Sequence, residues 1–431
     1  MASERPNIIF VVVETLRADH LRAWGYGRNT MPIVEDLARD GLIFDRAISA
    51  APWTLPSVAS ILTGTSPSVH GVRTYEDVIP DDAMTLAEHL SKAGYETAFF
   101  GVNSLFEANR NVKQGFDRYY GIDEIPGTQL NEQISGFVRH RTDPRPLFLY
   151  IHYFEPHCRY IPPKAMRELY FPPTPELTTN RVITDEQLRS MHECFHLNRR
   201  SGEPIYELDY YLAEYDAEIR YVDHLIGLTL EHLKTAGLYD QSLLAVLGDH
   251  GEEFWEHGTF GHGRSLNEPA IHVPMVIRPP GGTSPTRVKA PVSTMDLAPT
   301  ALALAGLPVP EVMQGVNLAP IWQEADMSSI EGRPVFSETD YETFHFRSIH
   351  DGALKLIMPV EGGSPSLYNL SSDPAQLSNL AKEHPDDVVT LSKRLDAHLA
   401  ESVIKAREIG TASRPLDDTI IERLKALGYT F

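Results

Sequence analysis

The chain has 431 residues, 42% of them hydrophobic, which is enough to bury one large core or two smaller ones. Its formal net charge of −21 arises from no block of like charges, which argues against a polyanion-binding surface spread over the protein, such as one for nucleic acid. The only cysteines, Cys158 and Cys194, are too few for a disulfide framework or a cysteine-based zinc site and suit a reducing compartment.

The first element in the chain is a short apolar run, "PNIIFVVV", at residues 6–13. It is too short to span a bilayer, and the start lacks the basic segment and the small-residue cleavage site of an export signal. We therefore expect a cytoplasmic protein with no membrane partner. Because the run is continuous and rich in β-branched residues, it predicts a parallel strand buried on both faces, with Glu14 at its carboxyl end.

Similar apolar runs recur along the chain and alternate with helical patterns. The predicted further strands are 96–102, 146–154, 242–250 and 272–280, and the predicted helices include 31–42, 85–95 and 215–237. This alternation predicts an α/β fold with a doubly wound, mostly parallel sheet flanked by helices.

Ligands of such sheets gather beyond the carboxyl ends of the strands. We therefore expect one shared site at that edge, formed by Glu14, Asn103, His157, Asp249 and His250.

After about residue 330 the pattern changes to short strand-like pieces followed by a helix at about 384–401. We predict a catalytic α/β domain over residues 1–332 and a smaller α+β subdomain over 333–431. Residues 160–213 are expected to form an insertion or a lid in the first domain.

The chain resembles the sulfatase branch of the alkaline phosphatase superfamily over nearly its whole length. The resemblance rests on the order and spacing of several segments, each weak alone. These are the opening "PNIIFVVVETLRADHLRAWGYG", then "TLPSVASILTG", "AGYETAFFG", "FLYIHYFEPH", "YDAEIRYVD", "GDHGEEFWEHGTFGHG", "VPMVIRPPG" and "MDLAPTALALAGLPVP".

The chain departs from the sulfatase pattern in the segment that carries the sulfatase nucleophile. Sulfatases carry Cys or Ser at the head of a C/S-x-P-x-R segment and convert it to formylglycine, but this segment reads Thr54-Leu55-Pro56-Ser57-Val58. Oxidation of a threonine gives only a ketone, so no formylglycine is expected. Thr15 replaces the second acid of the usual Asp-Asp pair, and Val102 and Ser104 replace the lysine and histidine of another sulfatase segment.

These departures resemble the lipoteichoic acid synthases and phosphoethanolamine transferases, which use Glu, Thr, Asp and His around one metal. Glu14, Thr54, Asp249 and His250 match that set, and the resemblance implies that Thr54 is the nucleophile.

The chemistry of these residues agrees with that implication. A threonine hydroxyl is almost fully protonated at neutral pH, so its attack on phosphorus requires a metal. The mixed oxygen and nitrogen donors favour one Mn or Zn ion, with Ca or Mg left open. A helix starting at Thr54, with Pro56 in its first turn, would add backbone donors for an anion. The alternative is that Thr54 is only a helix N-cap.

Two histidines match positions where the superfamily binds phosphate or protonates a leaving group, namely His157 and His262. Asn103 is interpreted either as a donor to a phosphoryl oxygen or as a loop-capping residue. His257 lies in the same loop as His262 and could exchange roles with it. Arg17 and Asp19 are expected to tie the first loop together.

A competing motif, "HECFH" at residues 192–196, matches the zinc peptidase pattern. It would place His192 and His196 on one helix face, with Glu193 as general base. No third ligand stands out downstream, so we interpret it as part of a surface helix.

The sequence thus predicts a metal-dependent hydrolase of small-molecule phosphate esters, with diesters or phosphonate monoesters favoured. Two-metal phosphatases need additional Asp and His ligands, and a monoanionic diester suits one metal better than a dianionic monoester does. The alternatives are a sulfatase that uses Thr54 without formylglycine, a phosphoryl-group transferase, and an inactive binding protein. A homo-oligomer is left open.

Overall fold

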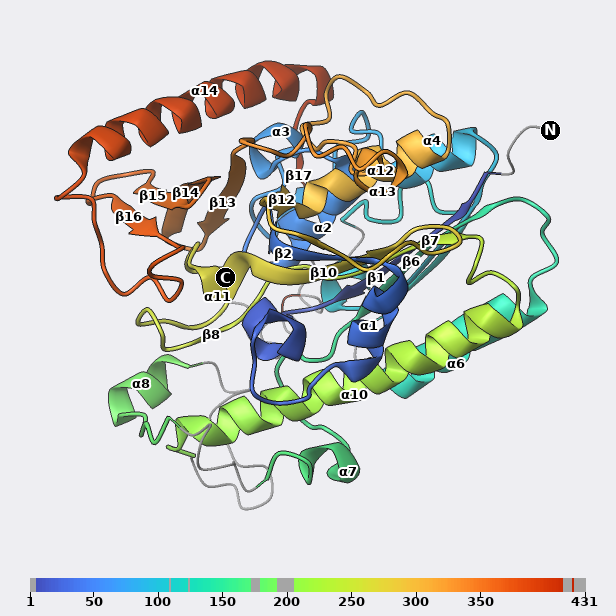
Figure 1. Cartoon of the computed structure of the whole chain (residues 1–431), viewed down its shortest axis with the longest axis horizontal. Helices are drawn as coiled ribbons and strands as arrows, with labels where there is room; N and C mark the ends of the chain where they lie inside the picture. The colour runs from blue at the N-terminus through green and yellow to red at the C-terminus, as the bar shows by residue number, and fades with distance from the viewer. Residues whose placement is uncertain are drawn as a thin grey trace.

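The computed structural model of the protein describes residues 5–107, 110–122, 125–171, 179–191 and 205–413, together with residue 421. Within them a nine-stranded central sheet has the order β11-β2-β10-β7-β1-β6-β4-β5, and β12 pairs with β2 (Figure 1). The bounds are β1 (Asn7–Val13), β2 (Leu42–Ile48), β4 (Glu96–Val102), β5 (Arg118–Ile122), β6 (Leu147–Tyr153), β7 (Ser242–Gly248), β10 (His272–Arg278), β11 (Thr286–Val288) and β12 (Val292–Ser293).

Strand direction follows the prediction in the middle of the sheet and departs from it at one strand. β7, β1, β6, β4 and β5 are all parallel, but β10, which was grouped with the parallel runs, pairs antiparallel with both β7 and β2. An apolar run indicates that a strand is buried on both faces. It does not indicate whether the strand runs parallel or antiparallel to its neighbours. The sequence did not single out four strands of this sheet, namely β2, β5, β11 and β12.

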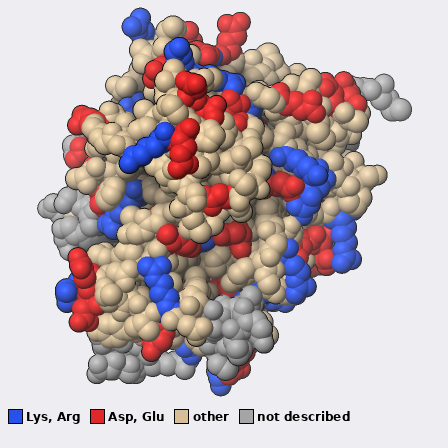
Figure 2. All heavy atoms as spheres, turned by 60° about the vertical axis from the view of Figure 1, so that its left-hand side comes forward, with Lys and Arg blue, Asp and Glu red and all other residues tan. Residues whose placement is uncertain are grey.

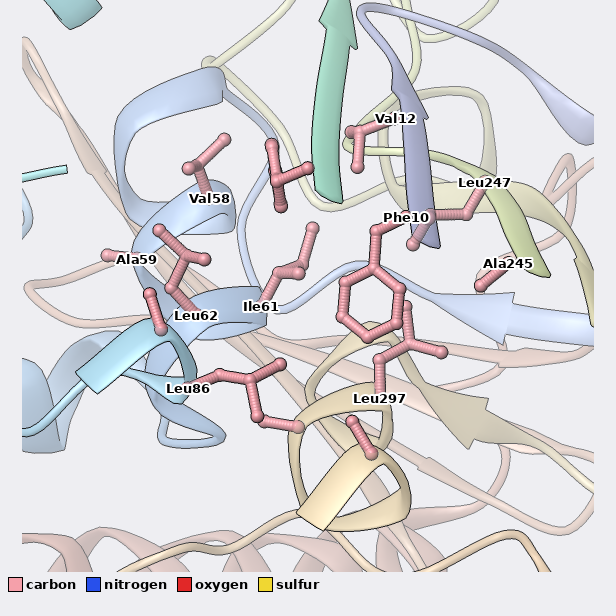
Figure 3. Packing of buried hydrophobic residues seen from close by; sticks show 14 of the residues in the cluster. Phe10, Val12, Val58, Ala59, Ile61, Leu62, Leu86, Ala245, Leu247 and Leu297 are labelled. Carbon is pink, nitrogen blue, oxygen red and sulfur yellow. The ribbon is translucent and has the colours of Figure 1, made fainter. Parts of the chain in front are cut away.

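Helices cover both faces of the sheet, which explains the continuous apolar runs. Ile8, Phe10 and Val12 of β1 enter one core with α2 (Thr54–Thr63), α4 (Leu86–Lys92) and α12 (Leu297–Leu304) (Figure 3). Ile9 and Val11 enter the opposite core with α1 (Pro32–Leu37), α6 (Gly127–His140) and α10 (Leu208–Thr235) (Figure 1). The predicted α/β fold is confirmed.

The predicted helices are present, with shorter or longer bounds. The expected helix at 31–42 is α1 followed by a 3-10 turn, 85–95 is α4, and 215–237 is the second part of the longer α10. The shorter elements are α3 (Pro67–His70), β3 (Asp77–Val78), α5 (Ser104–Glu107), α7 (Lys164–Arg167), α8 (Asp185–Ser190), β8 (Glu253–Phe254), β9 (Phe260–Gly261), α11 (Glu268–Ile271) and α13 (Pro320–Gln323).

The region predicted as an insertion or lid, residues 160–213, contains α7, α8 and the start of α10. Residues 172–178 and 192–204 lie outside the described residues, and with them the whole "HECFH" segment. Its interpretation as a surface helix stays a prediction.

The surface agrees with the composition. Basic and acidic side chains are interspersed on the face drawn in Figure 2, without a broad basic area. In the part of the chain that the structure describes, no helix combines the length and the apolar character needed to cross a membrane.

The last part of the chain forms a second, antiparallel sheet covered by one helix. Its order is β13 (Val335–Tyr341), β14 (Phe344–Asp351), β15 (Leu354–Pro359) and β16 (Ser366–Asn369), and α14 (Pro385–Ile409) lies over it (Figure 1). β17 (Ala412–Ser413) then returns to pair with β3. The α+β architecture is as predicted, and the exact boundary at residue 332 stays a prediction.

A buried ion pair joins the two parts. Lys355 of β15, which is 0% exposed, donates to Glu268 Oε1 of α11 at 2.6 Å. His350 Nε2 of β14 lies 2.8 Å from the same oxygen. Burial acts to raise the pKa of Glu268, but Lys355 and His350 outweigh it and hold that pKa well below its usual range. The carboxylate therefore stays charged between the two parts of the molecule.

Replacing Lys355 by Met should lower the free energy of unfolding by about 3–5 kcal/mol, because it leaves Glu268 buried without its cation. Urea unfolding at neutral pH measures this. The control is Lys164→Met, which removes a surface pair with Glu168 whose side chains are 81% and 65% exposed, and which should leave stability unchanged within error. Equal effects of the two substitutions would show that the buried pair does not hold the two parts together.

Candidate active site

The site lies at the carboxyl ends of four neighbouring parallel strands, in the order β7, β1, β6 and β4. Glu14 follows β1, Asn103 follows β4, His157 lies in the turn after β6, and Asp249 and His250 follow β7. The parallel direction of these strands brings their carboxyl ends to one edge, as the sequence predicted.

Thr54 is brought to this edge by α2. It is the first residue of the helix, and the N-cap, Trp53, makes no side-chain capping bond, so Thr54 is not the N-cap. The Thr54 hydroxyl, 0% exposed, donates to Glu14 Oε1 at 2.8 Å and lies 3.3 Å from His250 Nε2. The first turn of α2 also directs its backbone N–H groups, and the positive end of the helix dipole, toward this edge.

The side-chain amide of Asn103, the residue after β4, holds Glu14 in place. Asn103 Nδ2 donates to Glu14 Oε1 at 2.8 Å and to Oε2 at 3.0 Å, and Asn103 Oδ1 accepts from Leu105 N at 2.8 Å. Burial acts to raise the pKa of Glu14, but His152, His157 and Asn103 outweigh it, and the pKa lies below its usual range. Asn103 thus caps the loop and orients Glu14, while its predicted contact with substrate stays a prediction.

Asp249 and His250 present one ligand atom each. Asp249 Oδ1 accepts from the backbone N–H groups of Thr15 and His250, at 3.1 and 2.7 Å, whereas Oδ2 is buried and accepts no hydrogen bond. Burial and the charge of Glu14 raise the pKa of Asp249 well above its usual range. Burial also lowers the pKa of His250 well below its usual range, which keeps the imidazole neutral. His250 Nδ1 pairs with Gly251 O at 2.9 Å, so Nε2 carries the lone pair.

The two histidines predicted to contact substrate lie beside this group. The ring of His262 is 4.6 Å from that of His250 and 5.1 Å from that of His157. His262 Nδ1 lies 2.8 Å from Glu252 Oε1, and His157 Nε2 lies 4.0 Å from Glu14 Oε1. Because of this contact, Glu252 sets the orientation and tautomer of His262. Burial lowers the pKa of His157.

His152 was missed from the sequence, although it lies in the predicted strand at 146–154. It is 0% exposed, and its Nε2 is 3.3 Å from Glu14 Oε2 and 3.8 Å from Asp249 Oδ2. The available signal was a histidine inside an otherwise apolar run, one pleat from the strand end. Because alternate residues of β6 face opposite cores, the sequence did not indicate which way it points.

Thr15 is also part of the site, through its backbone. It has φ 53°, a left-handed conformation that is rare for a β-branched residue. This conformation points its N–H at Asp249 Oδ1 and its carbonyl at the Tyr215 hydroxyl, and the buried Thr15 Oγ1 has no hydrogen-bond partner. Such strain persists only where the surroundings hold it.

The donor set fits a divalent cation. Ligand atoms of Glu14, Asp249 and His250 all lie within 4.8 Å of one another, and all three residues are buried. Asp249 Oδ2, which is buried and accepts no hydrogen bond, is an oxygen that a cation could bind. A cation would also offset the repulsion between two buried carboxylates, and this mixture of carboxylate, imidazole and hydroxyl is typical of Mn²⁺ and Zn²⁺ sites.

Residues of the loop after β1 hold neighbouring segments in place and are not among the site residues described above. Arg17 forms a two-pronged pair with Asp19 at 2.9 and 2.7 Å and also donates to Glu252 O and Glu256 Oε1, so it ties the first loop to the β8–β9 hairpin. His257 lies in the turn of that hairpin, where burial lowers its pKa, and the charged residues that act on this pKa are Glu256, Lys355, Arg17 and Asp373. The exchange of roles with His262 stays a prediction.

Cys158, the residue after His157, is disulfide-bonded. The low cysteine count did not suggest this. Because disulfides are rare in reducing compartments, cysteine usage no longer favours the cytoplasm, and the compartment stays a prediction.

Two families match the chain. Residues 6–307 match the sulfatase family, and residues 255–405 match the C-terminal region of N-sulphoglucosamine sulphohydrolase. The first match covers the central sheet and every site residue described above.

Curated relatives and solved structures agree with these matches. The chain is 24% identical to the ulvan-active sulfatase of Formosa agariphila, over 99% of this chain and 85% of the relative. It is 25% identical to the choline-sulfatase of Rhizobium meliloti, over 93% and 87%. The phosphonate monoester hydrolase of Agrobacterium radiobacter has a similar fold, with TM-score 0.79, 21% identity, and coverage of 95% of this chain and 100% of that one.

Replacing Thr15 by Gly should change the free energy of unfolding by less than about 1 kcal/mol, because relief of the left-handed strain offsets the lost packing. The matched control is Thr97→Gly, at a threonine in β4 that is also 0% exposed but lies in extended backbone. It should lose about 2 kcal/mol or more, from its hydrogen bond to Gly115 O and from strand propensity. Equal losses in urea unfolding would mean that no strain is stored at Thr15.

Proposed function

The chain belongs to the sulfatase family, and from this premise we propose that it is a metal-dependent hydrolase of phosphate esters with Thr54 as the nucleophile. Hydrolysis of sulfate or phosphate esters follows from the family and its relatives. Within that class we favour phosphodiesters or phosphonate monoesters.

The position of the Thr54 hydroxyl supports the proposal most strongly. It lies at the N-terminus of α2, 2.8 Å from Glu14 Oε1 and 3.3 Å from His250 Nε2. Glu14 Oε1 can accept its proton, whereas the lone pair of His250 Nε2 is the one that would bind the cation. A hydroxyl placed at a helix N-terminus beside a proton acceptor can attack an anionic ester that the same helix end attracts.

Glu14, Thr54, Asp249 and His250 would hold the divalent cation. Such an ion supplies positive charge that makes the threonine oxygen a stronger nucleophile and stabilises the charge developing on the transferred group. The remaining work falls to the chain's own side chains, which orient the nucleophile and move protons.

In the first step the Thr54 oxygen forms a bond to phosphorus, and the bond from phosphorus to the departing alcohol breaks. The Thr54 proton passes to Glu14, which already accepts the hydroxyl's hydrogen bond. His262, oriented by Glu252, or His157 gives a proton to the departing oxygen, so the alcohol leaves neutral. The product is a phosphothreonine ester.

In the second step water attacks the phosphothreonine from the side that the alcohol has left. The histidine that gave its proton takes one from this water, and the Thr54 oxygen regains a proton as its bond to phosphorus breaks. The phosphate product leaves, and the side chains return to their starting protonation states.

The charge of the site favours a monoanionic substrate. Within the described residues, Glu14, Asp249 and His250 form the single cluster of acids and histidines close enough to hold a metal. One divalent cation beside two carboxylates leaves little positive charge for a dianionic monoester, so a diester or phosphonate monoester is the better match.

A sulfate ester is the second candidate substrate, because the relatives above include an ulvan-active sulfatase and a choline-sulfatase. A sulfate monoester carries the same single charge as a phosphodiester. On this alternative Thr54 attacks sulfur directly, without formylglycine.

A panel of nitrophenyl esters tests the proposal. We expect kcat/KM to be higher for the phosphodiester and the phenylphosphonate monoester than for the sulfate and the phosphate monoester. Thr54→Ala should lower kcat by several orders of magnitude, equivalent to roughly 4 kcal/mol or more of barrier, whereas Thr54→Ser should retain measurable activity because it keeps the hydroxyl.

The matched control is Thr63→Ala, at the other end of α2, where the hydroxyl donates to Ala59 O. This variant should stay within a few fold of the parent. A higher kcat/KM for the sulfate would reverse the substrate assignment, and a Thr54→Ala variant as active as Thr63→Ala would remove Thr54 from the chemistry.

A further inference from the structure

β13, the strand of the second sheet nearest the central sheet (Figure 1), directs alternate side chains toward segments that flank the site. Ser337, Thr339 and Tyr341 lie on this face of the strand and are all buried. The Ser337 hydroxyl donates to Ser49 O at 2.7 Å, and the Thr339 hydroxyl donates to Gly263 O, also at 2.7 Å. One face of β13 is therefore bound to loops on either side of the site.

Gly263, the residue after His262, is enclosed by three contacts. Its N–H donates to Pro52 O at 2.9 Å, just ahead of the nucleophile in the chain, and its carbonyl accepts from Thr339. Its φ of 86° lies in the left-handed region, and a Cβ at this position would meet the ring of Tyr341 at 2.7 Å. The Tyr341 ring thus leaves the backbone beside His262 no space on that side.

The Tyr341 ring also contacts the residue before the nucleophile. Its centroid is 5.5 Å from that of Trp53 and 5.6 Å from that of Tyr75, and the three rings meet edge-on. Trp53 is the N-cap of α2 and is 1% exposed. Tyr341 therefore packs against the start of the nucleophile helix and against the residue that follows His262.

We propose that Thr339 and Tyr341 are positioning residues, which hold His262 where it can protonate the departing oxygen. The inference rests on the proposed function, in which either His262 or His157 gives that proton, and it assigns the proton to His262. The two residues of β13 act through Gly263 and need no contact with the substrate. The second α+β unit is then part of the catalytic arrangement.

The two candidate proton donors are held in different ways. The hydrogen bond from Gly263 to Pro52 joins the loop of His262 to the segment that leads into α2 and its nucleophile. His157 lies in the turn after β6, where its Nδ1 pairs with Cys158 O at 2.7 Å. The contacts of β13 therefore bear on His262, through the loop whose place relative to the nucleophile they fix.

The rival interpretation is that β13 only attaches the second unit to the first. On that interpretation the loss of the Thr339 hydroxyl lowers the stability of the protein. It does not change how the rate depends on the leaving group, because no catalytic side chain moves.

A series of substituted phenyl phenylphosphonates separates the two interpretations. A nitrophenolate departs with little help from an acid, whereas the anion of a weakly acidic phenol needs a proton as its bond to phosphorus breaks. Thr339→Val keeps the shape of the side chain but removes the donor to Gly263. It should lower kcat/KM for the methoxyphenyl ester about tenfold and leave that for the nitrophenyl ester within about twofold of the parent. The ratio of the two values therefore rises about fivefold or more.

Ser337→Ala is the matched control, because it removes a buried hydroxyl from the same face of β13 that also donates to a backbone oxygen at 2.7 Å. It should leave the ratio unchanged. Thr339→Ser keeps a hydroxyl and should restore the parent ratio. If Thr339→Val does not fold, Tyr341→Leu removes the ring from Gly263 and should raise the same ratio.

Two results would overturn the inference. One is a ratio in Thr339→Val, or in Tyr341→Leu where that variant replaces it, equal to those of the parent and of Ser337→Ala. The other is a parent-like ratio in His262→Gln, because His262 would then not give the proton. A parent protein that hydrolyses none of these esters contradicts the proposed function itself, and the inference falls with it.

Discussion

Two carboxylates, Glu14 and Asp249, are buried side by side at the edge of the central sheet. Hydrogen-bond donors around them partly offset the repulsion between their charges. Asn103 donates to both oxygens of Glu14, and two backbone N–H groups donate to one oxygen of Asp249. The other Asp249 oxygen is left without a hydrogen bond. Two like charges in a desolvated site are stable only with compensation, and a divalent cation supplies it most simply.

The fold produces this arrangement through the parallel strands β7, β1, β6 and β4. Their side chains are buried on both faces, so the polar residues can lie only beyond the strand ends, where the chain leaves the sheet. α2 packs its apolar side chains on β1 and β7, which sets the depth at which Thr54 meets Glu14 (Figure 3). Core packing and nucleophile position are therefore linked.

Apolar runs and turn positions were enough to predict five of the nine strands of the central sheet, helices on its faces, the second α+β unit and one strand edge for Glu14, Asn103, His157, Asp249 and His250. The direction of β10 was not predictable, because burial pattern does not encode strand direction. His152 was missed because its orientation depends on the pleat of β6, and the strain at Thr15 was missed because left-handed backbone in a β-branched residue has no sequence signal. The role of Asn103 toward Glu14 likewise depends on tertiary distance.

By its resemblance to sulfatases, Thr54 is expected at the position of the residue that becomes formylglycine, and on the proposed function an unmodified hydroxyl forms a covalent phosphothreonine there. The stereochemical course at phosphorus tests this claim most directly. When a chiral thiophosphate diester is hydrolysed in isotopically labelled water, two in-line displacements predict net retention of configuration. Net inversion would mean a single direct attack by water, and Thr54 would then not be the nucleophile.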